Sequence, residues 1–415
     1  MQSACCPILT EEQQQQENDN LKRQTIYDLW DTDRPARNLT GTDYEELIFQ
    51  RRMLDIIDHH AATNTQREGD EEQPLFLFYA PHVAHCPLQV PQSYLDQFDW
   101  MDNDEDMCKA QTKTIVGPDD NTPKYSCRKQ YHAMVKLLDD ILKSLVDRLK
   151  YHNMWDNTLM VVTSDNGGPI DPDESGATNF PLRGGKYSDF EGGVRAVAFA
   201  SGGYIPPERR GKKVTQPIHI CDWYATLPAL AGIDVHKETN MNRLDDNRIP
   251  AVDAVDVWPV LMGDSSDDTV KEIPLSRDAL IIGDYKLLWS QSQNITEAGW
   301  TTADYPNSHT ARHGIRPQSI NCSTGCLFNV ASDPGERTDM AALDPSRVED
   351  MQQRLIELRK GFFENDDRGV DSCPKGYNDD DKNLLCACWM AVNYYGGFFG
   401  PYQELNITDG FLMEE

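Results

Sequence analysis

Apolar residues at helical spacing alternate with short continuous apolar runs along the first two thirds of the chain. The helical spacing predicts helices over 43–60, roughly 128–152 and 220–231. The continuous runs at 75–80, 158–163 and 194–200 are typical of strands buried on both faces, as in a parallel sheet. Helices and strands in this order predict an α/β fold, with helices flanking a parallel or mixed sheet.

The pattern changes near residue 270. Short strand candidates follow at 279–282, 285–289 and 326–330, and then a helix near 346–363. We therefore expect three parts: an irregular polar segment over 1–41, the α/β domain over 42–270, and a smaller α+β domain with a Cys-rich tail over 271–415.

Charge narrows the classes of partner. The 415 residues include 39 Lys and Arg against 68 Asp and Glu, a net charge of −29 at pH 7. This excess argues against nucleic acid and against an anionic membrane surface, since both are bound by clustered basic residues. No apolar run approaches the roughly 18 residues of a membrane-spanning helix. An anionic substrate would need positive charge supplied locally.

Cysteines and sequons indicate an oxidising compartment. Eleven cysteines occur largely in clusters, and Cys108 and Cys127 flank a turn-rich stretch that we expect to be a stapled loop. Four N-x-S/T sequons provide candidate glycosylation sites at Asn38, Asn294, Asn321 and Asn406. The first residues show neither the charged nor the apolar region of a signal peptide. We therefore expect this sequence to begin inside a larger secretory-pathway protein, either lysosomal or extracellular.

Oxygen ligands follow the apolar run at 158–163. Ser164-Asp165-Asn166-Gly167-Gly168 places a carboxylate and an amide carbonyl where α/β sheets bind their ligands, at the carboxyl end of a strand. Both groups suit Ca²⁺ or Mg²⁺, so Asp165 and Asn166 are candidate metal ligands. The same residues are also good turn formers, which is the structural alternative.

Two further segments add an imidazole and an ammonium group. Pro81-His82-Val83-Ala84-His85-Cys86-Pro87 follows the first apolar run, and its prolines exclude a helix. A histidine there could protonate a leaving oxygen, or it could be an ordinary loop residue. Phe180-Pro181-Leu182-Arg183-Gly184-Gly185-Lys186 presents a lysine that can approach a tetrahedral anion or remain a surface lysine.

Taken together in this order, the segments resemble the sulfatase family, and most closely its arylsulfatase B branch. The likeness covers roughly residues 40–340 and is most specific between 75 and 232. It implies an alkaline-phosphatase-like fold that hydrolyses sulfate esters with one Ca²⁺ and a cysteine-derived formylglycine. By motif, it implies that Asp165 and Asn166 bind calcium, that Lys186 binds the sulfate oxygens, and that His85 protonates the leaving oxygen. The implied substrates are sulfated glycans or aryl sulfates.

The family's nucleophile motif does not occur in this sequence. Cys5-Cys6-Pro7-Ile8-Leu9 lacks the Ser and Arg of Cys-x-Pro-Ser-Arg, and the family's Asp-Asp calcium pair is missing too. We therefore expect a C-terminal portion of a sulfatase that is inactive and prone to aggregate alone. Two alternatives are a secreted pseudoenzyme that binds sulfated carbohydrate and a phosphodiesterase of the same superfamily.

Overall fold

The computed structural model divides the chain into two compact units. The first comprises residues 1–148 and 363–415, and the second comprises residues 149–362. The structure describes residues 2–3, 26–32, 34–41, 43–65, 73–101, 127–170, 176–237, 252–264, 272–290, 299, 319–362, 391 and 395–398. Asn294, Asn406 and Cys108, with its predicted stapled loop, lie outside the described residues, although Cys127 is disulfide-bonded.

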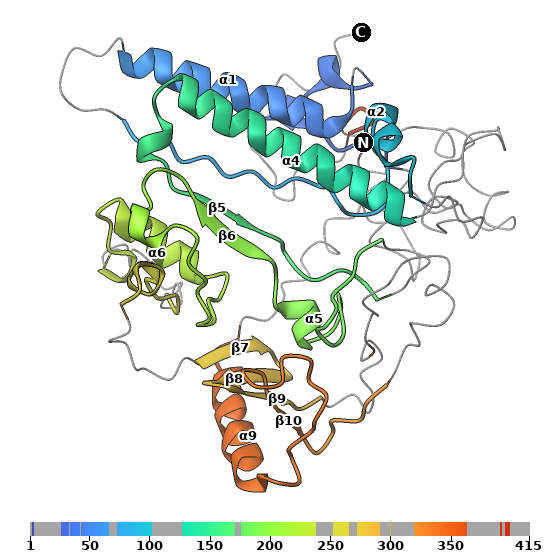
Figure 1. Ribbon diagram of the computed structural model, residues 1–415, viewed down its shortest axis with the longest axis vertical. Helices are drawn as coiled ribbons and strands as arrows, with labels where there is room; N and C mark the ends of the chain where they lie inside the picture. The colour runs from blue at the N-terminus through green and yellow to red at the C-terminus, as the bar shows by residue number, and fades with distance from the viewer. Residues whose placement is uncertain are drawn as a thin grey trace, which may run out of the picture. The chain divides into compact units, whose positions relative to one another are not determined.

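Two long helices dominate the first unit (Figure 1). α1 (Glu45–Thr65) and α4 (Cys127–Tyr151) confirm the first two predicted helices. Gln50 donates to Ser144 at 2.8 Å, and Asp58 pairs with Arg148, so the helices run in the same direction. A connection between parallel helices has to run back along them, which is how an α/β crossover is built.

The remaining elements of the first unit are short. They are β1 (Gln2–Ser3), β2 (Ile26–Tyr27), β3 (Trp30–Asp31), β4 (Arg34–Pro35), η3 (Arg37–Leu39), α2 (Gln92–Leu95) and η4 (Asp96–Phe98). β1 pairs with β2 and β3 with β4, both antiparallel.

The predicted strand at 75–80 is not formed. Residues 73–80 are extended, but no described strand pairs with them. Phe76 and Phe78 are 73% and 80% exposed, so the prediction of burial on both faces is also wrong here. The apolar pattern favours extended backbone, but a strand also needs a hydrogen-bonding neighbour, which the described part of the chain does not supply.

The second unit begins with a strand pair. β5 (Met160–Thr163) confirms the predicted strand, whereas β6 (Ala198–Ser201) starts later than expected, after α5 (Glu191–Val194). Both strands are only partly buried or exposed, so the prediction of burial on both faces is wrong for them too. The two strands pair antiparallel, and Val197 and Phe199 are exposed. α6 (Asp222–Leu230) confirms the third helix; Gly232 follows it with a φ of +80°. η5 (Trp155–Asn157), η6 (Pro207–Arg209) and α8 (Trp258–Met262) complete this part.

A four-stranded antiparallel sheet forms the C-terminal part of the second unit. Its order is β10 (Cys326–Asn329), β9 (Tyr285–Leu288), β8 (Ala279–Ile282) and β7 (Glu272–Ser276), and α9 (Pro345–Arg359) accompanies it (Figure 1). Alternate residues serve opposite faces. Leu280, Leu287 and Leu327 pack with Leu355 of α9, while Leu288 and Phe328 face the other way and pack with Phe190. The predicted α+β elements are thus confirmed.

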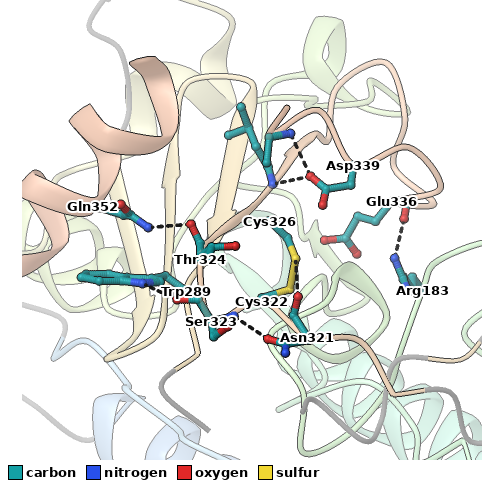
Figure 2. The surroundings of a disulfide bond; sticks show 12 residues. Arg183, Trp289, Asn321, Cys322, Ser323, Thr324, Cys326, Glu336, Asp339 and Gln352 are labelled. Atoms are coloured by element: carbon teal, nitrogen blue, oxygen red, sulfur yellow. Dashed lines mark hydrogen bonds between the residues drawn. A yellow bond between two sulfur atoms is a disulfide. The ribbon is translucent and has the colours of Figure 1, made fainter. Parts of the chain in front are cut away.

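A disulfide joins the first residue of β10 to the segment before it. Cys322 and Cys326 are bonded, and both are buried (Figure 2). Among the described helices, none combines the length and apolarity required to cross a bilayer.

Candidate functional site

The loop after β5 presents the two candidate metal ligands. Asp165 is exposed, and its Oδ1 accepts a hydrogen bond from the Asn166 amide at 2.7 Å. Asn166 Nδ2 donates to the Gly167 carbonyl at 2.8 Å. These bonds join neighbouring residues, and they fix the orientation of the Asp165 and Asn166 side chains.

Lys186 lies beside this loop. Its backbone N–H donates to the Gly168 carbonyl at 3.1 Å, so the segments carrying Asp165 and Lys186 are hydrogen-bonded neighbours in the second unit. The lysine is partly buried, and its ammonium lies 5.4 Å from the centroid of the Tyr187 ring. The structure therefore brings together the backbone segments that carry three of the four predicted site residues, Asp165, Asn166 and Lys186.

Asn179 clamps these two segments. Its Oδ1 accepts from Gly168 N at 3.0 Å, and its Nδ2 donates to the carbonyls of Gly168 at 2.7 Å and Gly184 at 3.1 Å. One amide side chain thereby fixes the backbone on both sides of the site. We call residues 179–190 the lysine loop.

Glycines make the close backbone approach possible. A side chain at Gly192 would collide with the carbonyl oxygens of Gly184 and Arg183, and one at Gly167 would collide with Gly192. The Gly-Gly pairs are therefore required by packing between backbones rather than by a turn alone.

The described residues supply part of a calcium shell. Ca²⁺ takes about six to eight oxygen ligands, and Asp165 and Asn166 provide two side chains of the correct chemistry. Among the described residues, no group of three or more His, Cys, Asp or Glu side chains is arranged to hold a metal ion. Asp165 and Asn166 are thus suited to Ca²⁺, but they provide only part of its ligand set.

Residues 81–87, which we call the histidine loop, belong to the first unit. Glu46 of α1 is almost fully buried and holds this loop through three hydrogen bonds: its carboxylate accepts from Tyr79 Oη at 2.6 Å and from the amides of His82 at 2.7 Å and Val83 at 3.2 Å. Burial and this bond to Glu46 raise the pKa of Tyr79 above its usual value, so the phenol stays a donor.

The two histidines in this loop have different surroundings. His82 Nδ1 lies 3.1 Å from a Glu45 carboxylate oxygen, and His85 is exposed with Nδ1 at 2.6 Å from the Cys86 carbonyl. The role of His85 in protonating a leaving oxygen stays a prediction.

Sequence reasoning missed several residues that hold the site in place. Asn179 directly precedes the Phe180–Lys186 segment, and Glu46 lies in the first turn of a helix, where acidic residues are common. The sequence did contain a signal that Lys286 is buried and paired, because this lysine interrupts an apolar strand between Tyr285 and Leu287.

The comparisons with known proteins identify the family. The family model described as "Sulfatase" matches residues 11–233, slightly more than half of the chain. The chain belongs to the sulfatase family. Arylsulfatase J of Mus musculus is 26% identical over 349 residues, covering 80% of this sulfatase chain and 52% of the relative. N-acetylgalactosamine-6-sulfatase of Homo sapiens is 25% identical over 313 residues, covering 73% and 49%.

The sulfatase chain thus spans about half the length of the curated relatives it matches. The crystal structure of Ps i-CgsB aligns with a TM-score of 0.53 at 23% identity, covering 77% of this chain and 56% of that one. This likeness concerns the fold. With the family match, it confirms the predicted α/β fold of the alkaline-phosphatase-like type. The arylsulfatase B branch stays a prediction.

Proposed function

We propose that this chain carries the sulfate-binding part of a sulfuric ester hydrolase. The supporting observation is the joining of the Asp165 loop to the lysine loop through Asn179 and the Lys186 amide. Lys186 then binds the sulfate oxygens as a point charge and stabilises charge that develops on the bridging oxygen. Local positive charge is needed because the chain as a whole carries −29.

Asp165 and Asn166 are the residues that would hold calcium, which when bound supplies positive charge near the ester. His85 would protonate the leaving oxygen. The nucleophilic role is assigned to no residue here, because the sequence contains no Cys-x-Pro-Ser-Arg segment. We therefore expect the chain by itself to turn over no sulfate ester.

The substrate class is a sulfated glycan. The support is the family and the names of relatives, among them N-acetylgalactosamine-6-sulfatase. In addition, Ps i-CgsB was solved in complex with k-i-k-neocarrahexaose. We also place the protein in the secretory pathway, supported by the Cys322–Cys326 disulfide and by exposed sequon residues at Asn38 and Asn321.

Anion binding at Lys186 tests this function directly. The purified chain is treated with an amine-acetylating reagent with and without inorganic sulfate, and mass spectrometry follows each lysine. We expect sulfate to slow acetylation of Lys186 but not of exposed Lys213, the matched control in the same unit. Equal rates at Lys186 in both conditions would contradict the proposal, and Lys186→Ala should abolish sulfate binding measured by calorimetry.

A binding protein for sulfated carbohydrate is the second candidate, because the family's nucleophile motif does not occur in the sequence. Turnover of a fluorogenic aryl sulfate by the purified chain would rule this candidate out. It would also overturn our expectation that the chain is inactive alone.

A further inference from the structure

Charged side chains lie buried between the lysine loop and the C-terminal sheet. Lys286 of β9 is fully buried, and its Nζ is 2.9 Å from Glu191 Oε1 and 2.9 Å from Glu336 Oε1. Glu191 opens α5, directly after the lysine loop, while Glu336 belongs to the turn after β10. A single ammonium therefore joins three segments that are far apart in sequence.

Glu336 also holds the backbone of the loop region. Its Oε2 accepts from the Glu191 N–H at 2.6 Å, and its carbonyl accepts from Arg183 Nη1 at 3.0 Å. Figure 2 shows the Arg183 guanidinium directed at that carbonyl. Arg183 and Glu191 stand at the two ends of the segment that presents Lys186.

The charges in this cluster are nearly balanced, which explains how they can be buried. Lys286 faces Glu191 and Glu336, and Arg195 approaches Glu191 Oε2 at 3.2 Å. Arg183 stacks on Phe190, with its guanidinium carbon 4.6 Å from the ring centroid. Buried charges that are paired are tolerated, whereas loss of one partner leaves the other exposed to its full desolvation cost.

The cluster is connected to the candidate site by a short path. Gly192 N donates to the Arg183 carbonyl at 2.6 Å, and Gly184 is held by Asn179, which also holds Gly168. Displacement of Glu191 or Arg183 therefore moves the backbone beside Lys186, because at the glycines these segments pack backbone against backbone, with no side chain between them.

We propose that Glu336 and Lys286 are positioning residues that hold the lysine loop in its anion-binding shape from the C-terminal sheet. Both lie beyond residues 11–233, the part matched by the family model. The inference rests on the proposed function for the role of Lys186, and it assigns a task to the C-terminal sheet in that site.

Hydrogen exchange of the full chain tests the mechanical part without reference to activity. Glu336→Ala leaves the Lys286–Glu191 pair intact and removes the acceptor of the Glu191 N–H. We expect exchange at the amides of Gly184, Lys186 and Gly192 to accelerate about tenfold, the effect of losing one buried hydrogen bond. Amides paired between β8 and β9 should keep their rates.

Glu272→Ala is the matched control. It removes a carboxylate from β7 that binds Arg354 of α9 at 2.7 and 2.8 Å, and among the described residues these contacts do not involve the lysine loop. It should leave the loop amides unchanged. If Glu336→Ala accelerates the sheet and the loop equally, or changes neither, the positioning role is overturned. Should that variant fail to fold, Glu336→Met, which keeps most of the volume but has no side-chain oxygen to accept from the Glu191 N–H, is judged by the same criteria.

Sulfate protection of Lys186 separates this inference from the proposed function. In Glu336→Ala, the inorganic sulfate concentration that half-protects Lys186 from acetylation should rise about tenfold, in line with the looser loop, while Glu272→Ala should match the unmodified chain. No protection in the unmodified chain would refute the proposed function but leave the exchange result standing. Unchanged protection in Glu336→Ala, despite faster loop exchange, would refute the positioning role alone.

Discussion

Asp189 shows at the scale of one residue how burial acts on a carboxyl group beside the site. Burial raises the pKa of Asp189, although the hydrogen bond from Ser276 Oγ, at 2.8 Å, and the charge of Lys286 oppose the shift. An acid whose pKa is raised by folding binds protons more readily in the folded than in the unfolded state. Its contribution to stability is therefore present below the ordinary carboxyl pKa and is lost as the pH rises through the raised value.

Asp189→Asn should remove this pH dependence. The variant keeps an oxygen that can accept from Ser276 but never becomes charged. We expect its thermal midpoint, relative to the unmodified chain, to rise between about pH 4 and pH 7, since only the unmodified chain must ionise a partly buried acid. Calorimetry across this range measures the difference. A difference that stays constant or falls with pH would contradict the prediction.

Single residues also show where sequence reasoning was sufficient. Asp165, Asn166 and Lys186 could be selected because ligand chemistry stands next to strand ends and glycines, which are local signals. Glu46 and Glu336 could not be selected, because their partners are 33 and 145 residues away in sequence. A buried carboxylate is recognisable only when the group that pairs with it is known.

At the scale of elements, the site depends on a crossing of glycine-rich backbones. Gly192 of α5 packs directly against the carbonyls of Arg183 and Gly184. Gly192→Ala should lower the free energy of unfolding by about 3 kcal/mol, because the obstacle is backbone that cannot rotate away. Gly361→Ala is the control, since a side chain there meets only the Leu358 carbonyl at 3.7 Å. Urea unfolding of both variants checks this, and equal midpoints would contradict it.

Helices were predicted better than strands for a physical reason. The apolar stripe over 128–152 corresponds to α4 almost residue for residue, because a helix satisfies its own backbone. The continuous apolar runs at 75–80 and 194–200 indicate extended backbone, but a strand forms only where a neighbouring strand supplies its hydrogen bonds. Residues 73–80 stay extended without a described partner, and Glu191–Val194 form a short helix whose first residue is bound by Glu336 and Lys286.

At the scale of the whole molecule, surface charge and exposed apolar side chains oppose each other. The net charge of −29 keeps copies of the chain apart. Within the first unit Phe76 and Phe78 are 73% and 80% exposed, and within the second Phe199 is 50% exposed. Exposed aromatic residues in extended segments favour association between chains. The balance between the two effects depends on ionic strength.

Salt should therefore promote self-association of the purified chain. Raising salt from about 0.01 M to about 1 M shortens the Debye length from roughly 30 Å to roughly 3 Å and removes the repulsion. We expect a larger sedimentation coefficient at high salt for the unmodified chain. The double variant Phe78→Ser with Phe199→Ser should stay monomeric at both salt concentrations, because it removes exposed apolar surface. It should also fold normally, because neither side chain contributes to a buried cluster. Tyr151→Ser, which removes an aromatic side chain that is 79% exposed at the end of α4, should behave like the unmodified chain. A chain that stays monomeric at high salt without substitution would show that these apolar residues do not drive association.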